Sequence, residues 1–388
     1  MNAGLFLQSE IRDPYAVYQQ MLERSSVVRD EINKCWLVYS YEKCRSILTA
    51  PNAIIPDANP GNKSGLYEYA LLILDNLVRL SNGQRHEIAR TCTMQLFEQM
   101  KRVAIGDVLS RLPAFDSDKT QIDWVKDVCK IAPVAYLLES FGFRRHDREY
   151  IANHIEVLTK LMTPARTPEQ VTVINSIAEP VYKMIGEHLV NTEFMKTISD
   201  RISREGRSAD SDFLSLCVAN LLGILIQSYD AGRGLLSNSL LQILRNDDNI
   251  SPENIGRGYI KKSVVEVLRF DPPVQNTRRV ATNEIVLGDI VIHNDDSIVL
   301  MIAAANRDPS KFENPQSYDI NRPNNKEHLT FGHGPHACIA NQFSTMLATE
   351  ILEFLFSKYS KVHCPTNVVE YEPLINVRLP KEMIISLK

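Results

Sequence analysis

Apolar residues recur at helical spacing through most of the first two-thirds of the chain. Tyr15, Tyr18 and Met21 form one such stripe, and residues three or four apart share a helix face. A short apolar run at Lys34–Tyr39 predicts a strand between two helical segments. The pattern predicts helices at Asp13–Glu23, Tyr41–Thr49, Tyr67–Leu80, His86–Gln99 and Ala340–Tyr359.

A segment rich in turn-forming residues interrupts this helical pattern early in the chain. Proline, asparagine, glycine and aspartate are dense between Pro51 and Ser64, which predicts a long loop. Loops of this length in compact domains commonly bind ligands or close over them.

The longest predicted helix runs from Asp210 to Leu244. It is apolar on nearly every face from Phe213 to Ile226, as expected of a helix buried in a large core. Its midpoint, Gln227–Gly234, is anomalous because it contains two glycines, an aspartate and an arginine. Glycine lowers helix stability by about 1 kcal/mol relative to alanine. Either a kink or close helix packing explains the unusual composition of this midpoint, or the irregularity marks a functional site.

The pattern changes to short strands and irregular segments after residue 250. Ser251-Pro252-Glu253 has the N-cap and first-turn proline of a helix that would end at Phe270. A long irregular stretch follows at Asn306–Gly334. Alternating runs predict a small antiparallel sheet from Glu284–Leu287, Ile290–His293 and Ser297–Met301, and two later strands at Leu374–Leu379 and Met383–Leu387.

These elements predict a mainly α protein with a small β portion, in the α+β class. Neither an internal repeat nor a linker divides the 388 residues, so a single domain over residues 1–388 is expected. Lys and Arg number 43 against 47 Asp and Glu, giving a net charge of −4 without a basic block. This balance argues against a nucleic-acid-binding protein.

No membrane span and no secretory signal are expected. The apolar stretch Val218–Ile226 is interrupted by Asn220 and is far shorter than the ~20 residues that a span requires. The N-terminal residues lead quickly to Glu10, Arg12 and Asp13, without the basic and apolar regions of a signal peptide. A cytoplasmic protein is therefore expected.

One of the seven cysteines stands in an unusual segment. The cysteines are scattered and form no Cys-x-x-Cys pair, so neither a disulfide framework nor a structural zinc site is expected. Cys338, however, follows the glycine-rich segment Phe331–Ala337 and precedes a predicted helix. Helix N-terminal amides lower a thiol pKa, and a thiolate held there suits a metal. A cysteine nucleophile with His336 as its base, or a simple buried thiol, remains the alternative.

The pattern Phe331-x-x-Gly334-x-x-x-Cys338 resembles the haem-binding loop of the cytochrome P450 family, in which the cysteine thiolate is the proximal ligand of haem iron. The resemblance extends from about residue 10 to the end of the chain and implies the P450 fold, with a long central helix across the haem. Further motifs in the family's order are Glu266-x-x-Arg269, Ala305-Asn306-Arg307-Asp308-Pro309, Asn321-Arg322-Pro323 and His86-x-x-x-Arg90.

The resemblance implies a role for each matching residue. Cys338 would ligate the iron of haem b, at the end of the loop that Phe331 begins. Three charged residues would form the buried network that holds the irregular segment near this loop, namely Glu266, Arg269 and Arg322. Four others would bind the haem propionates, namely His86, Arg90, Arg279 and His336. Taken alone, Glu-x-x-Arg is more simply a surface ion pair, and His86 with Arg90 a solvated helix face.

The central helix departs from the family pattern Ala-Gly-x-Asp/Glu-Thr-Thr. Gln227–Gly232 aligns there, so Asp230 retains the acid while Ala231 replaces the first threonine. In the family that hydroxyl supports proton delivery to bound oxygen. Here protons would have to come through ordered water, a substrate hydroxyl or Gln227. A monooxygenase is the first expectation. The alternatives are a peroxide-using, oxidative-coupling or cyclising haem enzyme, and a non-catalytic haem-binding partner protein.

The substrate pocket is expected to be lined by the loop between Ile54 and Leu80, the central helix and two later segments. Such pockets are mostly apolar with a few polar groups. The amides of Gln227, Gln275 and Asn276 predict a mid-sized, hydrogen-bonding substrate derived from an amino acid, a peptide or a polyketide, in secondary metabolism. The lining residues expected beside Gln227 are Ser228, Tyr229, Val274, Gln275, Asn276, Leu374 and Ile375.

Electrons are expected to come from a separate donor, because the chain contains no flavin-binding motif. The resemblance implies a ferredoxin and a ferredoxin reductase. Donors of this kind dock on the cysteine side, where Arg85, Lys101 and Arg102 would supply positive charge. Unrelated surface cations are the alternative interpretation of these three residues.

Overall fold

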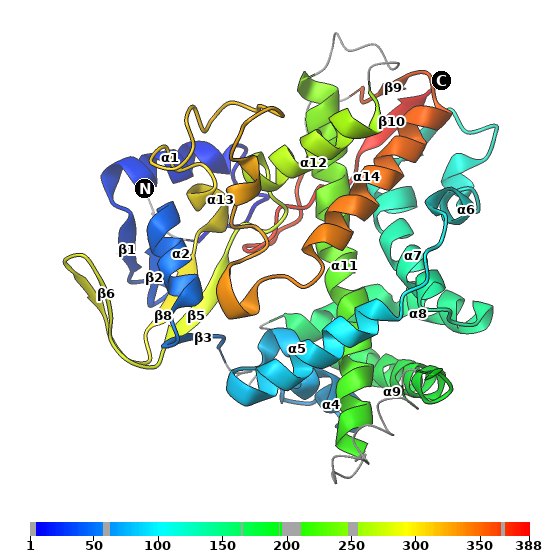
Figure 1. Ribbon diagram of the computed structural model, residues 1–388, viewed down its shortest axis with the longest axis horizontal. Coiled ribbons are helices and arrows are strands. Elements are labelled where there is room, and N and C mark those ends of the chain that lie inside the picture. The colour runs from blue at the N-terminus through cyan, green and yellow to red at the C-terminus, as the bar shows by residue number, and fades with distance from the viewer. Residues whose placement is uncertain are drawn as a thin grey trace. The chain divides into compact units, whose positions relative to one another are not determined.

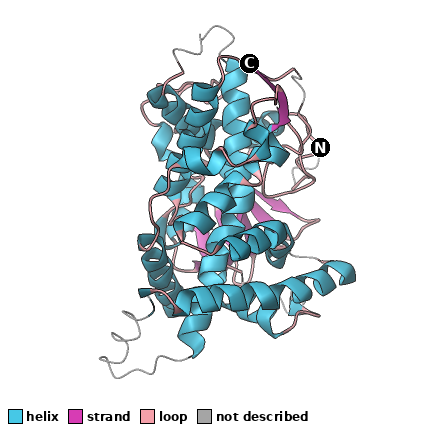
Figure 2. Ribbon diagram, turned by 90° about the vertical axis from the view of Figure 1, so that its right-hand side faces the viewer, coloured by secondary structure: helices cyan, strands magenta, loops and turns pink. Residues whose placement is uncertain are grey.

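The computed structural model describes residues 5–56, 63–163, 166–193, 195, 211–246, 255–365 and 369–388. Backbone contacts divide the chain into two compact units. Unit 1 comprises Met1–Ile54, Ile105–Lys130 and Ala231–Lys388, and unit 2 comprises Ile55–Ala104 and Ile131–Asp230. Helices dominate and strands are few, as predicted for a mainly α protein (Figure 2).

Unit 1 contains a five-stranded sheet in the order β1-β2-β8-β5-β3. Strand β2 pairs with β8 in parallel, with Trp36 opposite Ile298, while the other neighbours are antiparallel. The predicted antiparallel pairing is confirmed between β5 and β8, but the sheet is larger than predicted and mixed, because two N-terminal strands join it from far away in the sequence. The strands are β1 (Val27–Asp30), β2 (Cys35–Val38), β3 (Ala53–Ile54), β5 (Thr277–Ala281) and β8 (Ser297–Leu300).

Apolar side chains cover both faces of this sheet. On β8, Ile298 and Leu300 join one apolar cluster with residues of α2 (Tyr41–Thr49), whereas Val299 joins another with residues of α1 (Pro14–Arg24). Successive side chains of a strand point to opposite faces, so a strand buried on both sides has a continuous apolar run. The two helices therefore cover opposite faces of the sheet.

Two smaller strand assemblies complete the β portion of unit 1. β6 (Ile285–Leu287) and β7 (Ile290–Ile292) form an antiparallel hairpin, as their sequence pattern predicts. The prediction of a strand at Leu374–Leu379 is wrong, because only Val377 forms an isolated bridge there, with Val274. A three-stranded sheet has the order β4 (Gln121–Asp123), β10 (Ile384–Leu387) and β9 (Val362–His363).

The helices of unit 1 begin and end at clear local signals. Asp13 caps α1, because its carboxylate accepts hydrogen bonds from the Tyr15 and Ala16 amides. α12 ends at Phe270, as predicted, but begins at Arg257 after Gly256; the predicted start at Ser251–Glu253 lies outside the described residues. The remaining helices are α6 (Ile105–Leu109), η2 (Pro113–Phe115), η3 (Trp124–Cys129), α13 (Ile302–Ala305), η6 (Asn325–Glu327), η7 (Gly334–His336) and α14 (Asn341–Lys358).

Unit 2 is helical. The junction between its helices α4 and η1 is fixed by Asn220, whose side chain accepts a hydrogen bond from the Val78 amide and donates to the Asn76 carbonyl oxygen. The polar residue that interrupts the apolar stretch of the sequence thus satisfies backbone groups that would otherwise be buried unpaired. Its elements are α4 (Glu68–Asn76), η1 (Val78–Leu80), α5 (Gly83–Glu98), α7 (Ala132–Ser140), α8 (Arg145–Thr159), η4 (Lys160–Met162) and α9 (Pro168–Val190).

The predicted long helix is α11 (Ser211–Asn246), which runs without interruption through its anomalous midpoint (Figure 1). A kink is therefore not the explanation of Gly234. A β-carbon there would lie 2.5 Å from Leu379 Cδ2 and 2.6 Å from Pro273 Cβ, so close packing requires glycine. By length and composition α11 is the one helix in the described part of the chain that could cross a membrane, but 67% of its most apolar stretch is buried inside the protein. It is a core helix.

Candidate active site

The cysteine loop has the conformation that its glycines predict. Gly332 and Gly334 have φ angles of 70° and 73°, in the left-handed region that favours glycine. The Cys338 amide donates a 2.7 Å hydrogen bond to the Phe331 carbonyl oxygen, and the Ala337 amide donates to the Gly334 carbonyl oxygen at 3.0 Å. The loop is thus closed on itself, with the thiol at its end.

The loop also lies directly against α2. A β-carbon on Gly334 would lie 3.0 Å from the Leu48 carbonyl oxygen and 3.1 Å from Thr49 Cγ2. On Gly332 the nearest atom would be the His336 carbonyl oxygen, at 3.6 Å. Gly334 is therefore required both by its φ angle and by the space available.

Cys338 lies just before α14, whose N-cap is Ala340. The thiol is half-buried, whereas five of the other cysteines are buried. No group of three or more His, Cys, Asp or Glu side chains in the described residues is arranged to hold a metal ion. A metal bound at Cys338 would need its other ligands from a non-protein group, and a single thiolate at the end of a glycine loop fits iron in a porphyrin.

Arg279, on β5, has the environment of a cation that awaits an anionic ligand. It is only 3% exposed, and its Nη1 donates to the Arg278 carbonyl oxygen at 2.7 Å. Its buried Nε has no hydrogen-bond partner among the described residues. Burial lowers the pKa of Arg279 to about 10. A propionate carboxylate would satisfy this group, so Arg279 fits its predicted role beside haem.

The other predicted propionate ligands lie on two separate segments. His336 is half-buried in the cysteine loop of unit 1. In unit 2, α5 carries His86 and Arg90 four residues apart, on one helix face. His86 is buried, and its Nδ1 lies 3.1 Å from the Val78 carbonyl oxygen.

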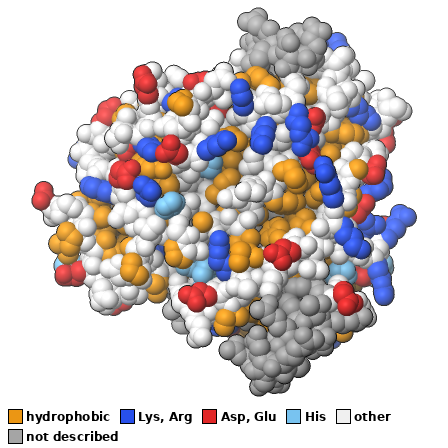
Figure 3. Space-filling model, viewed as in Figure 1, with side chains coloured by type: hydrophobic (Ala, Val, Ile, Leu, Met, Phe, Trp, Pro, Cys, Tyr) orange, Lys and Arg blue, Asp and Glu red, His pale blue; other side chains and the backbone are white. Residues whose placement is uncertain are grey.

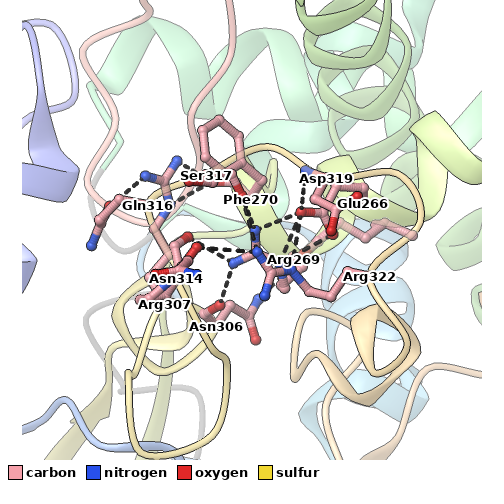
Figure 4. Close-up of polar contacts among 12 residues, drawn as sticks. Glu266, Arg269, Phe270, Asn306, Arg307, Asn314, Gln316, Ser317, Asp319 and Arg322 are labelled. Carbon is pink, nitrogen blue, oxygen red and sulfur yellow. Dashed lines mark hydrogen bonds and ion pairs between the residues drawn. The ribbon is translucent and has the colours of Figure 1, made fainter.

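Glu266, Arg269 and Arg322 come together in a buried charge network, as the resemblance implies (Figure 4). Arg269 Nη2 lies 2.6 Å from Glu266 Oε1, and Arg322 Nε lies 3.5 Å from the same oxygen. The side chains of Glu266 and Arg269 have 0% exposure. An ion pair of this kind is destabilising unless its geometry and further hydrogen bonds offset the loss of solvation.

Backbone carbonyl groups provide those further hydrogen bonds. Arg269 donates to the carbonyl oxygens of Pro315 and Ser317, each at 3.0 Å, and Arg322 donates to that of Asn314 at 3.1 Å. The two guanidinium groups thus bind backbone carbonyl groups of the irregular segment after α13 and help to fix its course.

Asn306 connects this segment to the cysteine loop. Its side chain accepts a 2.7 Å hydrogen bond from the Leu329 amide and donates to Thr330 Oγ1 at 2.8 Å. Thr330 directly precedes Phe331. The sequence motif that contains Asn306 was noted, but the partners of its amide could not be identified from spacing.

The turn of α11 at Gln227–Ala231 is only partly buried, in contrast to the preceding turns. Gln227 Nε2 donates to the Gly223 carbonyl oxygen at 3.0 Å, and Ser228 Oγ donates to that of Leu225 at 2.8 Å. Gln227 and Ala231 are four residues apart on a continuous helix and therefore share a face. The carboxamide lies one turn before the position of the missing hydroxyl.

Several predicted pocket residues are instead held by protein contacts. Tyr229 is buried, and its hydroxyl donates to Glu156 Oε2 at 2.7 Å. Gln275 is 0% exposed; its Nε2 donates to the Pro272 carbonyl oxygen at 2.7 Å, and its Oε1 accepts from the Tyr18 hydroxyl at 3.2 Å. The interpretation of Gln275 as a polar group of the pocket is therefore wrong, because its hydrogen-bonding groups join unit 1 internally.

Other predicted pocket residues of unit 1 lie together. Asn276 Nδ2 donates to the Ile375 carbonyl oxygen at 2.9 Å, and Val274 forms an isolated bridge with Val377. Leu374 and Ile375 are half-buried in the turn thus attached. The structure brings these two segments side by side, although the Asn276 donor is used to hold them.

The three cations predicted to contact an electron donor are all exposed. Arg85 donates to the Asp75 carbonyl oxygen at 2.5 Å and to Asn76 Oδ1 at 3.3 Å, which fixes its position on unit 2. Charges of both signs occur among apolar side chains on the face drawn in Figure 3.

Sequence comparisons agree with the geometry of the site. A family profile described as Cytochrome P450 matches residues 239–384. "Cytochrome P450 109" of Bacillus spizizenii is 25% identical over 356 residues, covering 89% of this chain and 84% of the relative. The "Biotin biosynthesis cytochrome P450" of Bacillus subtilis is 24% identical over 388 residues, covering 97% of each chain.

Solved structures share the fold. One neighbour is P450BioI in complex with an acyl carrier protein ligated to hexadec-9Z-enoic acid. It superimposes with a TM-score of 0.80 at 22% identity and covers 98% of this chain and 100% of its own.

Proposed function

Because the chain belongs to the cytochrome P450 family of haem-dependent monooxygenases, we propose that it binds haem b through Cys338 and oxidises a mid-sized organic metabolite. The closed cysteine loop carries this proposal, because its one half-buried thiol lies beside a helix N-terminus. The buried, incompletely bonded Arg279 supports it independently.

Different residues of the site bind different parts of haem in this proposal. Cys338 ligates the iron, and Arg279, His336, His86 and Arg90 bind the propionates. Bound haem supplies dioxygen activation, to which electron donation by the thiolate contributes. Glu266, Arg269 and Arg322 position the irregular segment, and Asn306 with Thr330 extends that support to the cysteine loop.

Proton delivery depends on the turn of α11. Ala231 offers no hydroxyl, so we assign this function to Asp230, to ordered water and to the carboxamide of Gln227. The carboxamide shares a helix face with Ala231, and one of its two N–H groups is bonded to Gly223, while its Oε1 can accept a hydrogen bond from water or substrate. A substrate hydroxyl can supply the remaining link.

The substrate forms hydrogen bonds with polar side chains in this proposal. The amides of Gln227 and Asn276 each use one N–H within the protein, and Gln227 Oε1 and the lone pairs of Ser228 Oγ are acceptors. A hydroxyl- or amide-bearing intermediate derived from an amino acid, a peptide or a polyketide fits such a surface. We therefore assign the protein to secondary metabolism.

The electron donors are a ferredoxin and its reductase, acting in the cytoplasm. Arg85, Lys101 and Arg102 provide exposed positive charge on unit 2 for the donor. The two compact units together form one P450-like domain over residues 1–388 in this proposal.

A carbon monoxide spectrum tests the assignment of the iron ligand. The reduced, carbon monoxide-bound protein should show the long-wavelength absorbance of a haem thiolate, and Cys338→Ser should abolish it. Cys364→Ser is the matched control, because Cys364 is also half-buried but lies outside the loop. A haem-thiolate spectrum that persists in Cys338→Ser would contradict the proposal.

Turnover experiments distinguish a monooxygenase from a peroxide-using enzyme and from a haem-binding partner protein. These alternatives arise because Ala231 replaces the threonine of the family pattern. Product should form with ferredoxin, reductase, NAD(P)H and dioxygen. Product formed only with added peroxide would favour a peroxide-using enzyme. Haem binding and ligand-induced spectral shifts without any product, across a panel of metabolites, would favour a haem-binding partner protein.

A further inference from the structure

Two cysteines of unit 2 lie in direct contact away from the cysteine loop. Cys92 is on α5 and Cys217 is on α11, 125 residues later. Their Sγ atoms are 3.2 Å apart, and the two residues are 2% and 0% exposed. None of the seven cysteines, all of which lie in the described ranges, is in a disulfide.

The contact between the two sulfurs differs from the hydrogen bond that another buried thiol, Cys44, makes with a backbone carbonyl group. Cys44 donates its S–H to the Val38 carbonyl oxygen at 3.2 Å, which is a partner that cannot be oxidised to a cross-link. Cys92 and Cys217 instead have each other as partners. An S–S bond is about 2.05 Å long, so small side-chain rotations would close the remaining gap.

Both thiols are protected from large reagents. Their mutual hydrogen bond, together with burial, raises the pKa of Cys217, so the thiolate that reacts with peroxide is scarce at this residue and its oxidation is expected to be slow. A bulky alkylating reagent cannot reach side chains with this little exposure. Hydrogen peroxide is small and uncharged, and it carries the two oxidising equivalents that a disulfide requires.

We propose that Cys92 and Cys217 form an oxidation site, at which hydrogen peroxide converts the two thiols to a disulfide that links α5 to α11. One sulfur attacks a peroxide oxygen, the O–O bond breaks, and water leaves with a sulfenic acid as the product. The second sulfur then displaces the sulfenic oxygen as a second water. In total, two thiols and one hydrogen peroxide give one disulfide and two water molecules.

This cross-link would join two functional helices of unit 2. α5 carries His86 and Arg90, the latter two residues before Cys92, while α11 carries Gln227 ten residues after Cys217. The disulfide would close a long loop and restrict the unfolded chain, which raises thermal stability. The site is separate from the proposed iron ligand, so its oxidation does not depend on the proposed activity.

Peptide mapping of the holoprotein tests the oxidation site. The protein is treated with a small excess of hydrogen peroxide, unfolded in iodoacetamide and digested with trypsin without reductant. We expect one cross-linked species that joins Thr91–Lys101 to Ser208–Arg233, lacks two hydrogens relative to the sum of the peptides, and disappears on reduction. Separate alkylated peptides, or sulfinic acid on either cysteine in place of the cross-link, would overturn the proposal.

Thermal unfolding provides a second measurement. Peroxide should raise the Tm of the wild type by several degrees, reductant should reverse the change, and Cys92→Ala should show no rise. Cys44→Ala is the matched control, because it removes an equally buried thiol and should retain the cross-link and the rise in Tm. A cross-link that leaves Tm unchanged would contradict the proposed linkage of two packed helices. The carbon monoxide spectrum, recorded in parallel, reports separately on Cys338.

Discussion

Gly334 of the cysteine loop faces the carbonyl oxygen of Leu48 so closely that a β-carbon on the glycine would lie 3.0 Å from it. The contact joins the loop to the C-terminal turn of α2. Both partners are backbone groups at this point, so neither can move aside as a flexible side chain would.

We therefore expect Gly334→Ala to destabilise the protein by about 2–4 kcal/mol, because a left-handed φ angle and a steric clash both act against alanine. Its haem content should also fall, since the loop presents Cys338. Urea unfolding and the ratio of haem to protein absorbance measure the two effects.

Gly142→Ala separates the effect of the left-handed φ angle from that of the steric clash. Gly142 has a φ angle of 79°, but a β-carbon there would meet nothing within 4 Å. This variant should lose only the about 1–2 kcal/mol of the unfavourable backbone conformation and keep its haem. Equal losses in the two variants would show that the contact with Leu48 is unimportant.

Removal of Arg269 should be among the most damaging single substitutions in unit 1. Arg269→Leu leaves the Glu266 carboxylate buried without its main partner, and we expect a loss of about 3–5 kcal/mol of unfolding free energy. Arg257→Met is the control, because its ion pairs with Glu350 and Glu353 are partly exposed and should contribute at most about 1 kcal/mol. The double variant Glu266→Gln with Arg269→Leu should recover part of the loss.

Arg279→Leu should have opposite effects on the haem-free and haem-bound protein. Without haem, removal of a buried cation whose pKa is lowered by burial should leave stability unchanged or higher. With haem, loss of a charge-assisted hydrogen bond of about 1.5–3 kcal/mol should speed haem release about 10- to 100-fold. Transfer of haem to an acceptor protein measures the rate. Arg278→Leu, an exposed neighbour, should change neither quantity.

His328 should make the stability depend on pH below neutrality. Burial, with a contribution from Arg269, lowers its pKa to about 4, and its Nδ1 accepts a hydrogen bond from the Thr330 amide at 3.2 Å. Since the unfolded chain takes up this proton near pH 6.5 and the folded protein only near pH 4, stability is lost as pH falls between these values.

Urea unfolding at pH 7 and pH 4.5 tests this effect. Wild-type protein should lose about 1–3 kcal/mol more than His328→Gln over this interval. His146→Gln, at an exposed position, is the control and should behave as the wild type. An identical pH dependence in His328→Gln would show that the imidazole is not protected from protonation.

Ala231→Thr should change how electrons are used during turnover. The added hydroxyl would lie one turn after Gln227 and supply the missing proton donor, so product per NAD(P)H should rise and released peroxide should fall. Ala231→Val has the same shape without the hydroxyl and should not reproduce the gain. Gln227→Leu should lower product yield, and unchanged coupling in all three variants would exclude this turn from proton delivery.

Local sequence patterns determined much of this protein. The bounds of α2 agree with its pattern, and α11 and α14 differ from theirs by only one or two residues, because helical periodicity depends on neighbours within two turns. The cysteine loop was also predictable, because left-handed backbone at Gly332 and Gly334 is a property of single residues. Likewise, Glu266 and Arg269 are close because one helix separates them by three positions.

Only the tertiary structure decided which distant groups meet. Pairing of β2 with β8 and the contact of Cys92 with Cys217 join segments far apart in the chain. The distance in space between such segments cannot be inferred from their separation in the sequence. Gln275 was predicted to face substrate, yet its amide is used between Tyr18 and Pro272, and Arg279 is a buried cation whose Nε has no hydrogen-bond partner among the described residues. Burial and hydrogen-bond satisfaction are properties of the packed chain, so periodicity can place such residues on an element but cannot say what they contact.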